Sequence, residues 1–194
     1  MFRKLLRAKL SGIAELSESQ LSQLQTHYEL MLKWNKVLNL TTVTGLEEAI
    51  ERHYCESIFL AALLPPAPLR IADIGSGPGF PGFPVAVYRP DLTVTLIESH
   101  QRKAVFLREN SRGIANLKVI ASRAEDVDQG FDRVISRAVS YDDLLKPLTN
   151  LAPAADLLTG LEEPPAWPNW IWSGPLRLPW GTGRFVRTAS RRPV

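Results

Sequence analysis

The sequence predicts an α/β fold in which a doubly wound, mostly parallel sheet follows an N-terminal helical extension. Residues 17–64 carry apolar side chains at helical spacing, short β-rich runs follow residue 67, and helix-compatible segments separate those runs. Strands that alternate with helices imply right-handed crossovers and parallel pairing. We therefore expect residues 1–66 to form an extension packed on the core, and residues 67–194 to form the core.

Two helices are expected in the extension. Ser17 and Gln20 fit a capping box at the start of the first helix, and apolar side chains recur on one stripe after it. A second helix is expected over residues 46–64, where a Pro-Pro pair ends it. On this helix Arg52 and Glu56 have the i, i+4 spacing of an ion pair.

Four short runs are expected as core strands, and three helix-compatible segments separate them. The strand runs are residues 69–74, 93–98, 117–121 and 132–137, and the helical segments are about 82–88, 100–112 and 140–150. From about residue 156 the tail no longer shows the regular alternation of strands and helices. Residues 154–160 allow a fifth strand, and two later strand-like runs are expected to pair as a hairpin at the sheet edge.

Composition limits the classes of function. Cys55 is the only cysteine, which excludes an intrachain disulfide and a cysteine-rich zinc site. The three histidines lack ligand spacing, so we expect no metal. No apolar run approaches the ~18 residues of a membrane span. Because a signal-peptide hydrophobic block is also missing from the N-terminus, we expect a cytoplasmic protein without membrane contact.

Basic residues gather at both ends of the chain. Four lie in the first ten residues and four in the last eleven, with no acidic residue among them, and the formal net charge is +3. Two basic ends fit a polyanionic partner. Composition alone favours a simpler interpretation, in which the termini are solvated and partly disordered.

The segment "DIGSGPGFPGFP" (residues 73–84) follows the first predicted strand. A glycine-rich turn there faces the crevice at the carboxyl ends of the strands, where nucleotide-like ligands bind. The spacing G-x-G-x-x-G is present at Gly77, Gly79 and Gly82, and it is typical of dinucleotide sites. This interpretation predicts an NAD-linked enzyme.

A second interpretation starts from the end of the strand. If the strand ends at Ile74, the first functional glycine is Gly75 and the spacing becomes G-x-G-x-G. Asp73 precedes the turn, where a carboxylate repels a pyrophosphate but attracts a cation such as S-adenosylmethionine (AdoMet). Glu98, at the end of the second strand, can accept both ribose hydroxyls of either cofactor. Asp73 with its alternate glycines resembles the first motif of class I AdoMet-dependent methyltransferases.

Further motifs narrow this resemblance to one family. In order, the chain contains "KWNKVLNLTTV", "ERHYCESI", "DIGSGPGFPGFPVAV", "LIESHQRKAVFL", "SRAED" and "VISRAV". Together they resemble the bacterial small-subunit rRNA guanine-N7 methyltransferase family, also called glucose-inhibited division protein B, over roughly residues 15–155. The resemblance implies a Rossmann-like class I fold, AdoMet as cofactor, and methyl transfer to a guanine in the 530-loop region of 16S rRNA. It also implies the small ribosomal subunit or its RNA as partner, and we expect a monomer.

The same resemblance implies a cofactor site built from four segments: Asp73, Gly75, Gly77, Phe80, Glu98, Ala124, Glu125 and Arg137. Ala124 and Glu125 would meet the adenine, and Glu98 would hold the ribose. Arg137 would lie near the methionine moiety or the RNA. A surface ion pair is the alternative for Arg137, and a solvated acid at a helix start is the alternative for Glu125.

Five further residues are candidate RNA contacts: Arg52, His53, Arg102, Lys103 and Arg123. His53 shares an apolar stripe, so a satisfied core histidine is an equal alternative. The family's pattern has aspartate where this chain has Glu56, and we expect the longer side chain to keep its pair with Arg52.

The segment "WNKVLNLT" allows two interpretations. Asn35, Asn39 and Thr41 would belong to a cap over the cofactor cleft, or Asn39 would simply end a helix.

Guanine N7 has a free lone pair and no proton to lose, so methyl transfer to it needs no general base. Alignment and electrostatic placement of the cation would supply the catalysis. We therefore assign no catalytic residue, and Arg137 is the nearest candidate, as an orienter. Two alternatives stay open: an RNA-binding module that has lost activity, because the tail departs from the family pattern, and an NAD-linked oxidoreductase, which would lack an obvious catalytic acid.

Overall fold

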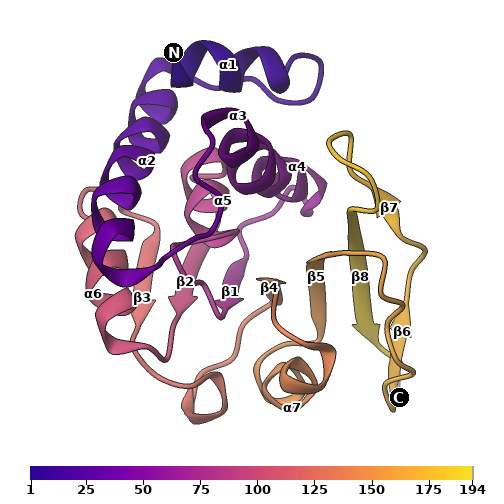
Figure 1. Cartoon of the computed structure of the whole chain (residues 1–194). Helices are drawn as coiled ribbons and strands as arrows, with labels where there is room; N and C mark the ends of the chain where they lie inside the picture. Colours follow the sequence, from indigo (N-terminus) through magenta and orange to yellow (C-terminus); the bar gives the residue numbers. More distant parts are fainter. Residues whose placement is uncertain (194) are drawn as a thin grey trace.

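An eight-stranded sheet forms the centre of the computed structural model, which describes residues 1–193 (Figure 1). Its strands are β1 (Arg70–Ile74), β2 (Thr93–Ile97), β3 (Leu117–Ile120), β4 (Arg133–Arg137), β5 (Ala154–Thr159), β6 (Trp170–Trp172), β7 (Leu176–Arg177) and β8 (Phe185–Arg191). The spatial order is β3-β2-β1-β4-β5-β8-β6, and β7 pairs with β8 beside this path. Strands β1 to β5 are parallel and β8 runs antiparallel to β5. The predicted parallel sheet and its strands are therefore confirmed.

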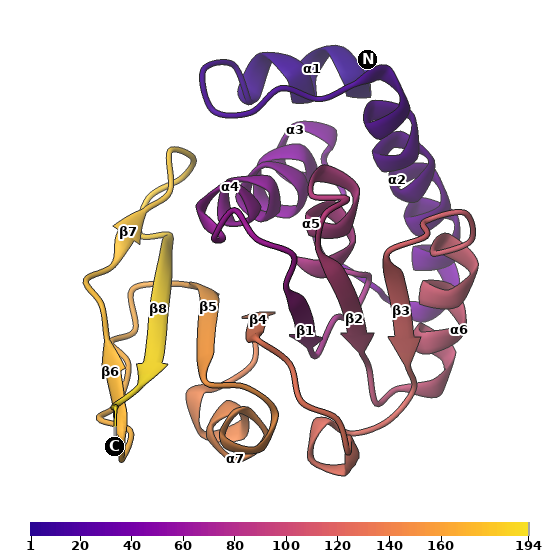
Figure 2. The ribbon, with the colours of Figure 1, turned by 180° about the vertical axis from the view of Figure 1, so that it is seen from behind.

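Helices cover both faces of the sheet (Figures 1 and 2). They are α1 (Phe2–Lys9), α2 (Glu18–Leu38), α3 (Leu46–Ala49), α4 (Glu56–Leu63), α5 (Gly82–Tyr88), α6 (Gln101–Asn110) and α7 (Tyr141–Leu151), with a π-helix at Ile50–Cys55 and a 3-10 turn at Ala124–Asp126. Side chains alternate along each strand, so Ile71 joins the core beneath α1 to α6, whereas Ala72 and Ile74 join the core beneath α7.

Helix α1 was not predicted. Phe2, Leu6 and Leu10 recur at helical spacing and are buried, so this basic segment packs on the molecule. Arg7 bonds Glu18 at 2.7 Å, and Lys9 bonds Glu47 of α3 and Glu51 of the π-helix. The expectation of a solvated, partly disordered N-terminus is therefore wrong, because an apolar stripe runs through the basic residues.

The second predicted helix is interrupted by the π-helix, whose wider turn shifts the side chains that follow. Glu56 faces inward, with 1% of its surface exposed, and bonds Arg184 from the tail. Arg52 faces outward and bonds Glu48 at 3.1 Å. The predicted pair between Arg52 and Glu56 does not form, because the two side chains lie on different sides of this segment.

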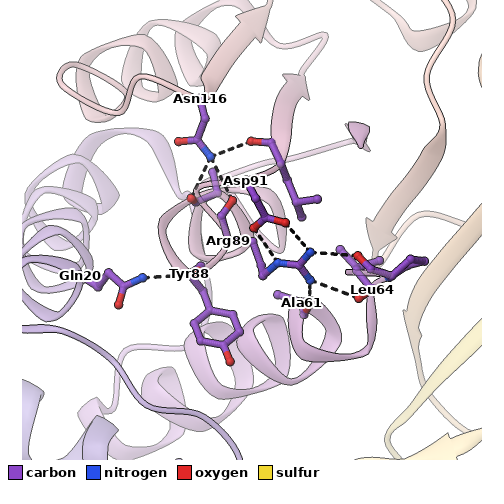
Figure 3. Close-up of polar contacts among 10 residues, drawn as sticks. Gln20, Ala61, Leu64, Tyr88, Arg89, Asp91 and Asn116 are labelled. Atoms are coloured by element: carbon purple, nitrogen blue, oxygen red, sulfur yellow. Dashed lines mark hydrogen bonds and ion pairs between the residues drawn. The ribbon is translucent and has the colours of Figure 1, made fainter. Parts of the chain in front are cut away.

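The extension is fastened to the end of α5 (Figure 3). Gln20 donates to the carbonyl oxygens of Val87 and Tyr88. The Arg89 guanidinium donates to carbonyl oxygens at the end of α4, including that of Ala61 at 3.1 Å, and it also pairs with Asp91. The division of the chain at residue 66 stays a prediction. One apolar core nevertheless runs through both parts, since residues of α2 and α5 belong to the same buried cluster.

The tail completes the sheet edge. The two strand-like runs pair antiparallel as β6 and β8, as predicted, and β8 rather than β6 joins β5. Tail arginines are paired with distant acids: Arg184 with Glu56, and Arg187, 3% exposed, with Glu163. As far as residue 193, the expectation of a disordered basic C-terminus is therefore wrong.

Two further properties concern the class of protein. None of the helices within residues 1–193 has the length and apolar character needed to cross a membrane. Within the same residues, no three His, Cys, Asp or Glu side chains gather in a way that could hold a metal ion.

Candidate functional site

The glycine loop leaves β1 directly after Ile74, which fixes its register. Gly75, Gly77 and Gly79 have φ values of +69°, +55° and +100°, a region that side chains other than glycine's rarely adopt. A Cβ on Gly75 would also lie 2.7 Å from Cγ2 of Val139. The loop therefore follows the G-x-G-x-G interpretation from Gly75, and the dinucleotide spacing that begins at Gly77 does not coincide with the end of the strand.

Asp73 lies beneath this loop rather than in the open cleft. Its side chain is fully buried, and Oδ2 accepts a hydrogen bond of 2.9 Å from the Gly82 N–H. A Cβ on Gly82 would lie 2.4 Å from Leu96 and 2.6 Å from the Asp73 carboxylate, so only glycine fits there. Burial raises the pKa of Asp73 to about 7. The carboxylate thus holds the start of α5 and can act on a ligand by charge, not by contact.

Two cavities meet at Gly75. The first, called here the β3-side cavity, has a volume of about 300 Å³. Its walls come from the ends of β1, β2 and β4, from the 3-10 turn and from α7: Ile74, Gly75, Ile97, Ser99, Ser122, Arg123, Ala124, Glu125, Val139, Asp143 and Pro147. The second, the Phe80-side cavity, has a volume of about 210 Å³ and is lined by Leu40, Thr41, Gly75, Ser76, Gly77, Pro78, Phe80, Arg137 and Ala138. Six of the eight predicted cofactor residues therefore line these two neighbouring cavities, which together are called here the cofactor cleft.

Glu98 stands between the glycine loop and α6. Its oxygens accept hydrogen bonds of 2.8 Å from the N–H groups of Gly77 and His100, and 7% of its surface is exposed. Each carboxylate oxygen keeps a further lone pair. Backbone donors fix its position, and Glu98 lines neither the β3-side nor the Phe80-side cavity.

A stack of planar groups closes the other side of the cleft. The His53 ring lies 4.5 Å from the Phe80 ring at an angle of 18°, and the Arg137 guanidinium lies 5.1 Å from the Phe80 centroid. His53 is 5% exposed, and its Nε2 lies 2.9 Å from Oγ1 of Thr41. Burial and the charge of Arg137 lower the pKa of His53, so the ring is neutral. His53 is thus a buried core histidine that also borders open space.

That open space is a third cavity of about 440 Å³, called here the large cavity. It is lined by Asn39, Leu40, Thr41, Thr42, Val43, Arg52, His53, Arg137, Ala138, Val139, Ser140, Tyr141, Leu158, Thr159, Gly160, Glu162 and Arg184. Leu40, Thr41, Arg137 and Ala138 also line the Phe80-side cavity, so the two spaces adjoin. Ala138 has a φ of +59°, a strained value for alanine, at this junction.

The segment after α2 lies where the large cavity and the Phe80-side cavity adjoin. Asn39 ends α2 in the left-handed conformation, as the end-cap interpretation predicts. The Asn35 side chain bonds both backbone groups of Thr41, at 2.9 and 3.0 Å. Thr41 also lines the Phe80-side cavity, whereas Asn39 lines the large cavity, and a cap over the cofactor cleft stays a prediction.

The family model described as rRNA small subunit methyltransferase G matches residues 20–154. The chain belongs to this family. A curated relative with that name from Chromobacterium violaceum is 40% identical over 130 residues, which cover 65% of this chain and 62% of the relative. Another from Halorhodospira halophila is 38% identical over 164 residues, or 81% and 78% of the two chains.

Several curated family members are matched over only about three fifths of their length, such as 56% of the Desulforamulus reducens protein. Solved structures support the fold alone. A SAM dependent methyltransferase from Aquifex aeolicus has a TM-score of 0.56 and 14% identity, covering 73% of this chain and 92% of that one. The 23S rRNA methyltransferase ErmE has a TM-score of 0.53 and 19% identity, and the match covers 73% of this chain and 69% of that one. Both matches agree with the predicted class I methyltransferase fold.

The candidate RNA contacts of this family member fall into two groups. Arg52 and His53 line the large cavity, and Arg123 lines the β3-side cavity. Arg102 and Lys103 lie at the start of α6 and line none of the three cavities. A third group consists of tail residues on the large cavity. Sequence reasoning included Arg184 only among the basic residues at the C-terminal end, because nothing local in the tail signals which distant wall it completes.

Proposed function

We propose that this protein transfers the methyl group of AdoMet to N7 of a guanine in 16S rRNA, in the 530-loop region. One observation carries the proposal: the cleft around Gly75 adjoins the large cavity at Thr41, Arg137 and Ala138. A cofactor in the cleft and a base in the cavity would meet at that junction. The family to which the chain belongs supports the same reaction.

The residues of the cleft fit AdoMet. Gly75 lines both the β3-side cavity and the Phe80-side cavity, and as a glycine it adds no side chain to the space between them. Glu98 offers carboxylate lone pairs to two hydroxyl groups, and the β3-side cavity beside Ala124 and Glu125 provides space for a flat base. The ionised form of Asp73 favours a cation near the loop.

AdoMet supplies an electrophilic methyl group on a cationic sulfur. The protein's part is alignment, which contributes up to ~7–11 kcal/mol when reacting atoms are held in line. Gly75 and Glu98 would fix the cofactor, and Arg137, held against Phe80, would orient the guanine or its phosphate. N7 keeps its lone pair at neutral pH, so no residue has to remove a proton. We assign no catalytic residue for this reason.

The partner in this proposal is 16S rRNA or the small ribosomal subunit, the protein is a cytoplasmic monomer, and no metal takes part. An RNA-binding protein without activity is the second candidate. Its support is that the family match ends at residue 154, while residues beyond it line part of the large cavity. Methyl transfer decides between the two, because only the first candidate labels the RNA.

The test is the variant Gly75→Asp, with Gly130→Asp as control. Gly130 has open space around it, so the same substitution should be harmless there. We expect calorimetry to show AdoMet binding by wild type and by Gly130→Asp, and at least a tenfold loss in Gly75→Asp. Thermal unfolding should show that all three are folded. Labelled methyl transfer to 16S rRNA should be lost only in Gly75→Asp, and equal AdoMet affinity in all three proteins would refute the site.

A further inference from the structure

Three arginines from distant parts of the chain line the large cavity. Arg52 comes from the π-helix, Arg137 from the end of β4, and Arg184 from the residue before β8. Arg184 lies beyond residues 20–154, the part that the family model matches. The loop between β7 and β8 approaches α4 in both ribbon views, and the tail comes from the edge of the sheet beyond β5 (Figures 1 and 2).

Arg184 is held by a buried carboxylate. Its Nε and Nη2 donate to the two oxygens of Glu56, at 3.0 and 2.7 Å, and Glu56 is 1% exposed. A guanidinium bound through two parallel bonds has a fixed direction. Nη1 of Arg184 makes no hydrogen bond to any of residues 1–193, so donor capacity remains on a side chain that borders the cavity.

Arg137 and Arg52 add donors to the same wall. Arg137 donates through Nη1 to the Arg52 carbonyl oxygen and has no ion pair within the described part of the chain. Burial, together with the charges of Arg184 and Arg52, lowers the pKa of Arg137 to about 10, although Glu56 opposes this. Burial first, and the neighbouring arginines after it, disfavour the charged form of Arg137, and an anion placed among these groups would favour that form.

One acidic residue, Glu162, also lines the large cavity. It is exposed, and within residues 1–193 its carboxylate bonds to none of the three arginines. The wall then carries three guanidiniums and one exposed carboxylate. Carboxylates outside the lining pair with Arg184 (Glu56) and Arg52 (Glu48), so within residues 1–193 Arg137 is the guanidinium of the wall without an ion pair. This balance favours an anionic ligand with several acceptor oxygens, and a phosphate diester matches the forked donors of arginine.

We propose that Arg184, with Arg137 and Arg52, forms a site for an RNA backbone phosphate on the wall of the large cavity. The proposal rests on the proposed function, since it places the phosphate beside the nucleotide that receives the methyl group. Phosphate contacts set the register of a nucleic acid without reading its sequence. The tail, although outside the family match, would thus help to position the target.

The carboxylate of AdoMet is another anion that arginines could bind. Arg137 lines both the Phe80-side cavity and the large cavity, whereas Arg52 and Arg184 line only the large cavity of these two. Two of the three arginines therefore face the space away from the cofactor cleft. This placement favours the RNA phosphate.

The experiment compares two double variants that each remove one arginine–glutamate pair and leave the net charge unchanged. Arg184→Met with Glu56→Gln removes the pair at the cavity without leaving a buried carboxylate alone. Arg187→Met with Glu163→Gln removes the pair on β8 that does not line the large cavity. The affinity of each protein for 16S rRNA is measured by anisotropy over a series of salt concentrations, and the AdoMet affinity by calorimetry.

We expect the first double variant to bind 16S rRNA more weakly and to reduce the slope of log affinity against log salt by about 0.7–0.9, the value for one phosphate contact. Its AdoMet affinity should equal that of wild type, and the control should match wild type in both measurements. The single variant Glu162→Gln should bind RNA more tightly, because it removes a negative charge from the same wall.

Equal salt slopes for the two double variants would overturn the phosphate site. Weaker AdoMet binding with an unchanged salt slope would also overturn it, since the arginines would then serve the cofactor carboxylate. These results are separate from the test of the proposed function. Wild-type protein that fails to bind AdoMet or to label 16S rRNA would refute the methyltransferase assignment, whatever the salt slopes.

Discussion

The buried carboxyl group of Asp73 makes the stability of the free protein depend on pH. Burial raises its pKa from 3.8 to about 7, so the folded protein binds this proton more tightly than the unfolded chain does. This contribution to the free energy of unfolding is complete below the pKa of Asp73 in the unfolded chain. It is lost as the pH rises through the pKa of Asp73 in the folded protein. One pKa unit corresponds to about 1.4 kcal/mol. The difference between 3.8 and about 7 therefore corresponds to about 4 kcal/mol by pH 8.

The variant Asp73→Asn tests this reasoning. The asparagine oxygen can still accept the hydrogen bond from Gly82, and the amide carries no charge to bury. Relative to wild type, the variant should gain little stability near pH 4 and up to about 4 kcal/mol by pH 8. Urea unfolding of the AdoMet-free proteins at pH 5, 6, 7 and 8 measures the difference directly. AdoMet should bind the variant more weakly, because the ionised carboxylate near the loop is gone.

Asp91→Asn is the matched control, because its carboxylate has the opposite environment. The Arg89 guanidinium holds the pKa of Asp91 below its ordinary value, so this group favours folding above the unfolded pKa. Asp91→Asn should therefore be less stable than wild type by an amount that stays constant from pH 5 to 8. A constant difference for Asp73→Asn over this range, or a variant less stable than wild type at pH 8, would contradict the argument.

Two other variants probe the packing beneath the loop. Gly82→Ala would force a Cβ to within 2.4 Å of Leu96 and 2.6 Å of Asp73. It should cost about 1–3 kcal/mol and lower the melting temperature by roughly 2–10 °C; an unchanged melting temperature would disprove the close approach. His27, fully buried and with a pKa lowered to about 4 by burial, donates from Nε2 to the Pro78 oxygen at 2.8 Å. His27→Phe leaves that oxygen unpaired and should destabilise the protein by about 1–3 kcal/mol. AdoMet affinity should also fall several-fold by calorimetry, and equal affinity would show that His27 does not position the loop.

The core strands could be predicted because their signals are local. Residues 69–74 and 93–98 are β-rich runs bounded by turn residues, and the strands occupy Arg70–Ile74 and Thr93–Ile97. The glycine register followed from the same signal, since the end of β1 at Ile74 makes Gly75 the first glycine of the turn. The prediction of this loop succeeded because its positive φ angles require glycine, and glycines can be read directly from the sequence.

The helical extension was predicted less well, because its signals conflict. The first ten residues are rich in arginine and lysine, which suggests a solvated terminus, but Phe2 and Leu6 recur on one face and hold α1 against the core. The π-helix at Ile50–Cys55 has no pattern of its own in the sequence, and it changes which neighbours Arg52 and Glu56 can reach. Pairings at i, i+4 hold only where the helix keeps its regular turn.

The contact that sequence reasoning missed joins Glu56 in the helical extension to Arg184 in the tail. The sequence resemblance implies aspartate at the position of Glu56, and Arg184 lies beyond residues 20–154, the part that the family model matches. The two residues are separated by 128 positions, so no local spacing could reveal their pairing. A glutamate reaches one methylene further than an aspartate, and here it binds both Nε and Nη2 of an arginine supplied by the tail. The Glu56 carboxylate thus holds the tail arginine at the wall of the large cavity, which connects the helical extension, the tail and the candidate site.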